Sequence, residues 1–470
     1  AGGPWGWVTG SSFRRIISFK GHASGRVSGM RIVFVTTFPT AESGGAGRVA
    51  HELAAASART HDVFLVTPGE RTEWIASPQG EPTRVRVATR GDGDVQLPDL
   101  RTRDGLEALL QDFRPDVVHA HDFSPLSLWF QDWAHRNGRP FVVTLHCLPS
   151  QAQAFGSLEK PRLTRWMGES PLFPTFIRLF LHRCDGVIAL NAAMVEDLRR
   201  FGYRGPLYRV PNGRDLAAYR NLPPADITQP VKELLFVGSF ARRKNQRYLL
   251  EMMAHLTVPA RLVLVGETLE PRYLEELRVH VRDRALGNVD IVGPVPHTEI
   301  PHLLRVAHVF VSASKLEVQS LAVIEALASG TPVVGLTNET VAELVDDAVG
   351  RRLPADASPA EFAREVEAIC RMPPEHYVAL CRAGQERVRS LDWQAVVEQN
   401  SRVYAELAAV SSGAGRKRAP LWTPWLVAAS ALRYGVHGLT HPAQGAAPGA
   451  GVPTGGSGSG PSSPSPRRAR

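Results

Sequence analysis

Between residues 30 and about 410 the chain repeats one pattern, in which short apolar runs rich in β-branched residues alternate with helical periodicity. Almost continuous apolar runs of this length are typical of parallel strands that are covered by helices on both faces of a sheet. The first series of predicted strands is 31–36, 62–66, 116–119, 140–145 and 186–190. The second series is 233–237, 261–265, 289–292, 308–312 and 332–335. Two such series predict an α/β protein with two doubly wound domains.

A segment rich in Pro, Asn and Asp near 206–230 separates the two series. We therefore place an N-terminal domain over 30–205 and a C-terminal domain over 206–390. Residues 391–408 are predicted to form a C-terminal helix. This helix could cross back to the N-terminal domain.

Both ends of the chain lie outside this pattern. Residues 1–29 are rich in Gly, Ser and Arg, and we expect a disordered or non-native extension that precedes Met30. Residues 409–470 are expected to form a disordered basic tail, because most of this segment is Pro, Gly, Ser and Ala. Within it, 419–434 is uncharged until Arg433 and carries Trp422 and Trp425, which makes it a candidate interfacial segment.

The net charge of +8 does not indicate nucleic-acid binding, because of where the charge lies. Residues 1–29 carry +4 and residues 411–470 carry +7, so 30–410 carries 8 − 11 = −3. A nucleic-acid-binding protein needs its basic surface on the folded body. The 43% of hydrophobic residues fit an ordinary globular protein, and no run of 18 apolar residues suggests a membrane span.

The four cysteines are sparse and form no C-x-x-C pair. This spacing favours a reduced, cytoplasmic protein over a disulfide framework or a structural zinc site. We expect neither a metal nor a cofactor.

The most informative segment is 312–335, where Glu317 and Glu325 stand eight residues apart. A predicted strand ends before Glu317, and a helix over 321–329 contains Glu325, so both should lie at the carboxyl end of a parallel sheet. The backbone N–H groups of three residues at the start of that helix are predicted to be free to hold a phosphate. These are Gln319, Ser320 and Leu321. Two carboxylates beside a phosphate site suit a sugar nucleotide.

Ten segments occur in the order found in the retaining glycosyltransferases of family 4, which the chain resembles over about 30–408. They are MRIVFVTTFPTAESGGAGRVAHELA, RPDVVHAHD, FVVTLH, CDGVIALN, YRVPNGRD, LLFVGSFARRKNQ, LVLVG, NVDIVGPVP, the Glu317–Glu325 loop and TVAELVDDAVGRRL. The resemblance implies the GT-B architecture, in which two Rossmann-like domains face each other across a cleft. It also implies transfer of a hexose from a nucleotide-diphosphate sugar without a metal.

The resemblance assigns donor-binding roles to Gly44 and Gly45 and catalytic roles to Glu317, Lys244 and His146. Glu325 is expected to hold the donor's ribose. Lys244 matches the family lysine that neutralises the diphosphate.

Ser239 stands where the family has an arginine, and the sequence leaves open whether Arg242 or Arg243 compensates. His119 and His121 also match a family pattern, and we interpret them as mainly structural, with His121 able to reach the cleft. We expect Gly213, in VPNGRD, to supply an unusual backbone angle.

For the acceptor we favour a membrane lipid. Gln319 replaces an aromatic–glycine pair in the manner of the diacylglycerol glucosyltransferase branch, and 159–183 mixes Arg with aromatic residues, which suits an anionic membrane. A core helix with extended Arg side chains explains 159–183 equally well. On the lipid interpretation the protein is cytoplasmic or peripheral on the inner face of the membrane.

Several alternatives remain open. The acceptor could be a polysaccharide, a sugar phosphate or another soluble sugar of the cell envelope. A nucleotide-sugar epimerase or an inactive sugar-nucleotide binder would carry a similar donor site. UDP-glucose, UDP-galactose and GDP-mannose all fit as donor.

Overall fold

The computed structural model describes residues 29–92, 95–99, 103–150, 172–219 and 223–411. Residues 1–28, residues 151–171, which include the first half of the predicted amphipathic stretch 159–183, and the tail 412–470 lie outside the described residues.

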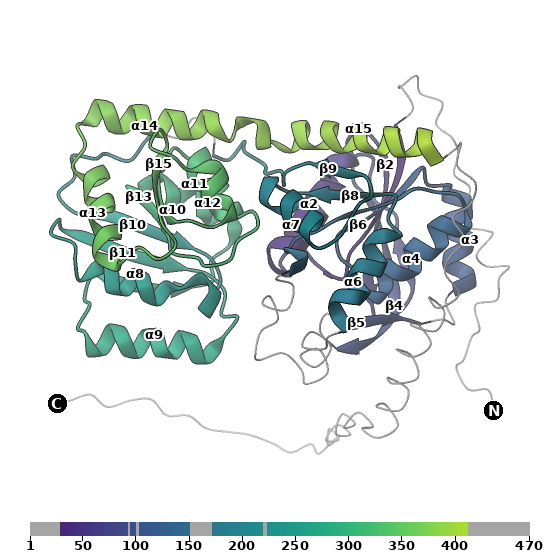
Figure 1. Ribbon diagram of the computed structural model, residues 1–470, viewed down its shortest axis with the longest axis horizontal. Coiled ribbons are helices and arrows are strands. Elements are labelled where there is room, and N and C mark those ends of the chain that lie inside the picture. The colour runs from purple at the N-terminus through teal and green to yellow at the C-terminus, as the bar shows by residue number, and fades with distance from the viewer. Residues whose placement is uncertain (1–28, 93–94, 100–102, 151–171, 220–222, 412–470) are drawn as a thin grey trace, which may run out of the picture. The chain divides into compact units, whose positions relative to one another are not determined.

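The first sheet has the strand order β3-β4-β2-β1-β6-β7-β8-β9, with β5 paired to β4. Figure 1 shows the strands of this sheet among helices. All neighbours run parallel except β3–β4 and β4–β5, which are antiparallel. Its strands are β1 (Arg31–Val35), β2 (Asp62–Gly69), β3 (Glu73–Ile75), β4 (Thr83–Asp92), β5 (Val95–Pro98), β6 (Val117–Ala120), β7 (Phe141–Thr144), β8 (Gly186–Ala189) and β9 (Leu207–Arg209).

Helices pack on both faces of this sheet, because alternate strand residues point to opposite sides. One core contains Val33 and Val35 with buried side chains of α3 (Arg103–Phe113), α4 (Pro125–Arg136), α6 (Leu172–His182) and α7 (Ala192–Arg200). The other contains Ile32 and Phe34 with side chains of α2 (Gly44–Ser57).

The second sheet is entirely parallel, with the order β12-β11-β10-β13-β14-β15. Its strands are β10 (Lys232–Val237), β11 (Ala260–Val265), β12 (Val289–Gly293), β13 (Val309–Ser312), β14 (Val333–Leu336) and β15 (Gly350–Leu353). The short 3-10 turns are η3 (Arg242–Lys244), η4 (His297–Glu299) and η5 (Arg389–Leu391).

Two hydrophobic cores lie against this second sheet as well. One gathers buried side chains of α8 (Gln246–Met253), α9 (Pro271–Asp283), α13 (Pro359–Cys370) and α14 (Pro374–Arg387). The other gathers those of α10 (Ile300–Val306), α11 (Leu321–Ala328) and α12 (Glu339–Leu344). A sheet that is covered on both faces explains why the strands read as continuous apolar runs.

The last helix, α15 (Trp393–Ser411), belongs by its packing to the first sheet. Its Trp393, Val403, Tyr404 and Leu407 are buried in the same core as Phe34. No described helix is both long and apolar enough to cross a membrane.

The predicted strands agree with the structure to within a few residues, and the two doubly wound sheets are confirmed. The sequence analysis missed β3, β4, β5, β9 and β15, which lie at or near sheet edges and have mixed polar sequences. Because β9 pairs with β8, the first sheet continues beyond residue 205.

Helix α6, which ends the 159–183 stretch, packs as a core element. Ile177, Phe180 and Leu181 are buried in the first domain. The Arg178 guanidinium lies 4.8 Å from the centre of the Phe201 ring and donates to the Phe201 carbonyl. In the described part of the stretch, the core-helix interpretation therefore accounts for the pattern without a membrane.

Candidate functional site

Each sheet has a point at which the strand order reverses direction. In the first sheet β1 lies between β2 and β6, and in the second β10 lies between β11 and β13. Ligands of open α/β sheets bind at the carboxyl ends of strands at such points. The segments that directly follow β1, β10 and β13, which include the start of α2 and the turn η3, carry most of the predicted site residues. These are Gly44, Gly45, Ser239, Lys244, Glu317, Gln319 and Ser320.

Lys244 and Glu317 meet between the loops that follow β10 and β13. The Lys244 Nζ donates to Glu317 Oε1, and both side chains are about nine-tenths buried. Burial lowers the pKa of Lys244, and the neighbouring carboxylate of Glu317 opposes that shift. The backbone also joins the two loops, since the N–H of Lys315 donates to the Arg243 carbonyl at 2.8 Å.

The loop that bears Glu317 is held by residues of the first domain and of the connecting segment. Val318 is buried in the core of the first domain, and its carbonyl accepts a hydrogen bond from the Asn191 side chain at 2.5 Å. The Gln319 side chain accepts from the backbone N–H of Asn212 at 2.6 Å. Glu317 is therefore fixed by contacts on both of its sides in the chain.

One predicted phosphate donor is already engaged. The Ser320 N–H donates to Thr340 Oγ1 at 2.8 Å, so the prediction that it is free is wrong. Thr340 lies in the first turn of α12, and a sequence pattern cannot show that its hydroxyl contacts the start of α11. Helix α11 begins at Leu321, as predicted.

Ser239, which stands where the family has an arginine, is held through its backbone. Its carbonyl accepts from Gln246 at 2.8 Å. Arg242 faces away from this point, because it pairs with Glu276 and lies 5.3 Å from the centre of the Tyr273 ring. Arg243 is close enough to lower the pKa of Lys244 electrostatically.

The glycines after β1 leave open space at the start of α2. Gly44 has φ of +89°, a conformation that favours glycine, and Gly45 has ordinary φ. A Cβ at either position would meet no atom within 4 Å. The side of the chain at Gly44 and Gly45 is therefore open, although the Gly44 N–H itself donates to the Glu42 carbonyl at 2.8 Å.

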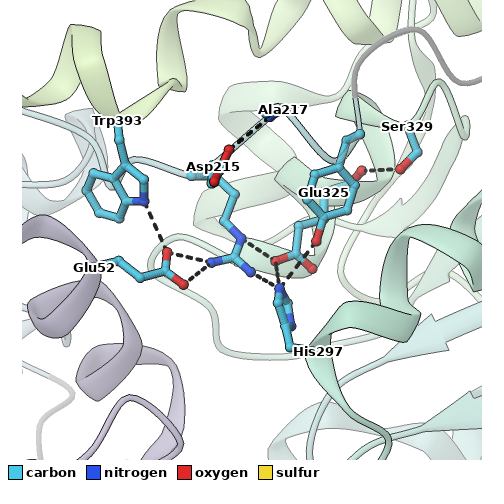
Figure 2. Close-up of polar contacts among 9 residues, drawn as sticks. Glu52, Asp215, Ala217, His297, Glu325, Ser329 and Trp393 are labelled. Carbon is cyan, nitrogen blue, oxygen red and sulfur yellow. Dashed lines mark hydrogen bonds and ion pairs between the residues drawn. The ribbon is translucent and has the colours of Figure 1, made fainter. Parts of the chain in front are cut away.

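Glu325 lies on α11 and is 3% exposed. Its Oε1 is 2.6 Å from Arg214 Nε and 3.4 Å from His297 Nε2 (Figure 2). Burial raises the pKa of Glu325 to about 6, and Arg214 opposes the rise. His297 contacts Arg214 as well, and burial lowers its pKa to about 3.

Arg214 also binds Glu52, which lies on α2 of the first domain. Its Nη1 is 2.6 Å from both carboxylate oxygens of Glu52, and the Trp393 indole donates to the same carboxylate at 3.1 Å (Figure 2). The sequence analysis missed Arg214, Glu52 and His297. The only available signal was the position of Arg214 directly after the Asn-Gly pair of VPNGRD.

Gly213 does not supply the unusual backbone angle that was expected of it. Gly213 is not among the described glycines with positive φ. A Cβ there would come within 2.2 Å of the Trp393 ring, so glycine is needed for the close approach of α15.

Three histidines stack at the ends of β6 and β7. The rings of His119 and His121 are 4.5 Å apart between centroids, and those of His121 and His146 are 5.4 Å apart. His121 Nδ1 lies 3.1 Å from His146 Nε2. His119 contacts Tyr404 Oη and Thr144 Oγ1, each at 2.7 Å. Burial lowers the pKa of all three rings, that of His146 to about 4. All three rings are therefore neutral at pH 7.

Among the described residues, no group of three or more His, Cys, Asp or Glu side chains is arranged to hold a metal ion. Lys244, whose side chain is 12% exposed, supplies a buried positive charge in the loop that follows β10.

The comparisons with known proteins agree with this geometry. The family model described as Glycosyltransferase Family 4 matches residues 43–218, and the model described as Glycosyl transferases group 1 matches residues 223–387. Two parallel doubly wound sheets that match these two models in sequence define a glycosyltransferase of the GT-B fold. The chain belongs to glycosyltransferase family 4.

Similar proteins act on different acceptors. A glycogen synthase of Mycobacterium tuberculosis is 26% identical over 411 residues, which cover 80% of this chain and 94% of that protein. A GDP-mannose-dependent α-(1-6)-phosphatidylinositol dimannoside mannosyltransferase of the same species is 27% identical over 386 residues, covering 78% and 93%. The sucrose-phosphate synthase structure from Thermosynechococcus elongatus has a TM-score of 0.65 at 22% identity, covering 81% and 100%.

Proposed function

We propose that this glycosyltransferase moves a hexose from a nucleotide-diphosphate sugar to its acceptor, with retention of configuration at the anomeric carbon. The observation that carries the proposal is the buried Lys244–Glu317 pair at the switch point of the second sheet. A buried ammonium group at this position is suited to the charge that develops on a leaving diphosphate.

In this scheme Lys244 donates to the donor's phosphate oxygens, and the start of α2 adds the backbone N–H of Gly45, since the Gly44 N–H already donates to the Glu42 carbonyl at 2.8 Å. Glu317, already anchored by Lys244, accepts from hydroxyl groups of the hexose. His146 hydrogen-bonds the same sugar from the first domain. Glu325 accepts the ribose hydroxyls, for which it uses the oxygen that does not face Arg214.

The ion pairs made by Glu317 and Glu325 support a transfer with retention of configuration. An inverting transfer needs a general base that is free to deprotonate the acceptor, and each of these carboxylates is instead engaged by a buried cation. Glu317 is bound to Lys244 and Glu325 to Arg214. We therefore assign the acceptor's proton to the leaving phosphate on the same face of the sugar.

We further propose that the reaction needs no metal ion. Lys244 offers a fixed positive charge where other transferases use a divalent cation. Activity should be unchanged after dialysis against EDTA, and restoration of lost activity by Mg²⁺ or Mn²⁺ would overturn this part of the proposal.

For the acceptor, we propose a membrane lipid. Its support is Gln319, which replaces the common aromatic–glycine pair, and the similarity to a mannosyltransferase that acts on phosphatidylinositol dimannoside. The similarity to a glycogen synthase favours a saccharide acceptor instead.

One experiment separates these acceptors and tests the reaction itself. The protein is incubated with radiolabelled UDP-glucose, UDP-galactose or GDP-mannose, with membrane lipid extract or with soluble glucans and sugar phosphates. Label in the organic phase supports a lipid, and label in a water-soluble saccharide supports the alternative. A donor sugar changed in configuration without transfer would identify an epimerase, and no change in any donor would contradict transferase activity.

A further inference from the structure

His146 is expected to face the donor sugar, and its chemistry there depends on which ring nitrogen carries the proton. A neutral imidazole donates from one nitrogen and accepts at the other. The hydrogen bond made by one nitrogen therefore decides what the other offers to a ligand. In this protein the nitrogen that is already engaged is Nε2, which lies 3.1 Å from His121 Nδ1.

The other nitrogen of each ring settles the direction of that hydrogen bond. His121 is 1% exposed, and its Nε2 is a buried atom with no hydrogen-bond partner among the described residues. Buried N–H groups without an acceptor are rarer in proteins than acceptors with an unused lone pair. The favoured form of His121 therefore has no proton on Nε2. Because the ring is neutral, its one N–H is then at Nδ1.

We propose that His121 is a positioning residue: its Nδ1–H donates to His146 Nε2 and holds His146 in the tautomer that carries its proton on Nδ1. His146 is half-buried, and no described residue hydrogen-bonds its Nδ1. His146 then offers an N–H donor to a sugar hydroxyl. This step rests on the proposed function, whereas the tautomer itself does not.

The surroundings hold His121 in place for this role. Its backbone N–H donates to the Val35 carbonyl at 2.9 Å, and its ring lies between those of His119 and His146. His119 is itself fixed at both nitrogens, by Thr144 and by Tyr404 of α15. Thus the last helix, through Tyr404, supports the ring that stacks against His121.

The tautomer can be measured without substrate. In protein labelled with ¹⁵N-histidine, two-bond ¹H–¹⁵N correlations distinguish a ring protonated at Nδ1 from one protonated at Nε2. The His146 signals are assigned by their loss in His146→Gln. We expect the Nδ1–H form of His146 in the wild type and in His121→Asn, whose side-chain amide can donate in place of Nδ1. We expect a shift toward the Nε2–H form in His121→Leu, which has no donor.

Activity then tests the consequence. With the donor that the protein uses, His121→Leu should lower kcat/KM roughly tenfold, the effect of one misdirected hydrogen bond, and His121→Asn should stay within about threefold of wild type. Thermal melting of each variant identifies any that fail to fold. If His121→Leu fails to fold, His121→Asn and the wild type still test the inference. An Nε2–H form of His146 in the wild type, or the same tautomer in the wild type and the Leu variant, would overturn the inference. Failure of the proposed function would appear separately, as an absence of nucleotide-sugar turnover by a wild type with the expected tautomer.

Discussion

Arg214 Nε lies 2.6 Å from Glu325 Oε1, and both side chains are only 3% exposed. The same guanidinium binds Glu52 on α2, so one cation from the connecting segment joins the helix that starts at Gly44 to the helix that starts at Leu321. These two helices frame the loops in which we place the donor.

The first prediction concerns this cation. Arg214→Met should lower the free energy of unfolding by about 3–5 kcal/mol, because it leaves a carboxylate buried without its partner. Urea unfolding followed by tryptophan fluorescence measures the change.

Two further variants make this test specific. Arg214→Met/Glu325→Leu should recover much of the loss, since no unpaired charge stays buried. Arg242→Met, which removes a pair that is about half exposed, should cost less than about 1 kcal/mol. Equal urea midpoints for Arg214→Met and wild type would show that the ion pairs of Arg214 with Glu52 and Glu325 do not stabilise the fold.

The second prediction separates a glycine needed for packing from one kept free for ligand. Gly213→Ala should destabilise the protein by about 1–3 kcal/mol, because its Cβ would overlap the Trp393 ring. Gly45→Ala should melt within a few degrees of wild type, since its Cβ meets no atom within 4 Å, but should weaken nucleotide-sugar binding. Calorimetry measures both effects, and a stable Gly213→Ala would mean that α15 does not pack at this distance.

The third prediction concerns pH. Burial lowers the pKa of His119 from 6.5 to about 3. A base whose pKa is lower in the folded state stabilises the fold above its unfolded pKa, and this stability is lost as pH falls from 6.5 toward 3. Between pH 7 and pH 5, His119 alone should reduce the free energy of unfolding by about 2 kcal/mol.

The check is the urea midpoint of wild type and His119→Asn at both pH values. The variant should be the less stable at pH 7, and the difference should shrink by about 2 kcal/mol at pH 5. A difference that is the same at both values would show that His119 is not buried as a neutral ring.

Much of the fold could be predicted because its central strands are buried on both faces. Runs such as 32–35 and 262–265 are apolar throughout, as expected of parallel strands that are covered on both faces. Strands at or near the edges lack this signal: β4 alternates polar and apolar residues over much of its length, and β9 has only three residues. The pairing of Lys244 with Glu317 was not predicted, although the loops that carry them follow the neighbouring strands β10 and β13.

Contacts between distant segments could not be predicted. The Ser320 N–H is taken by Thr340, 20 residues away, and Arg214 joins Glu52 from 162 residues away. Neither pair leaves a periodic pattern or a local motif. The role of Gly213 could not be predicted for the same reason. Its neighbour Trp393 is distant in sequence and lies beside it because α15 packs against the first sheet.

The most direct test of the account is the effect of Lys244→Met on donor turnover. If Lys244 stabilises the leaving diphosphate, kcat/KM with the preferred nucleotide sugar should fall by about 10²–10³, equivalent to about 2.7–4 kcal/mol of transition-state stabilisation. Arg242→Met, on the neighbouring residue that pairs outward with Glu276, is the matched control and should retain near-wild-type kcat/KM. A loss of less than threefold in a folded Lys244→Met variant would contradict the assignment and place the charge stabilisation on another group.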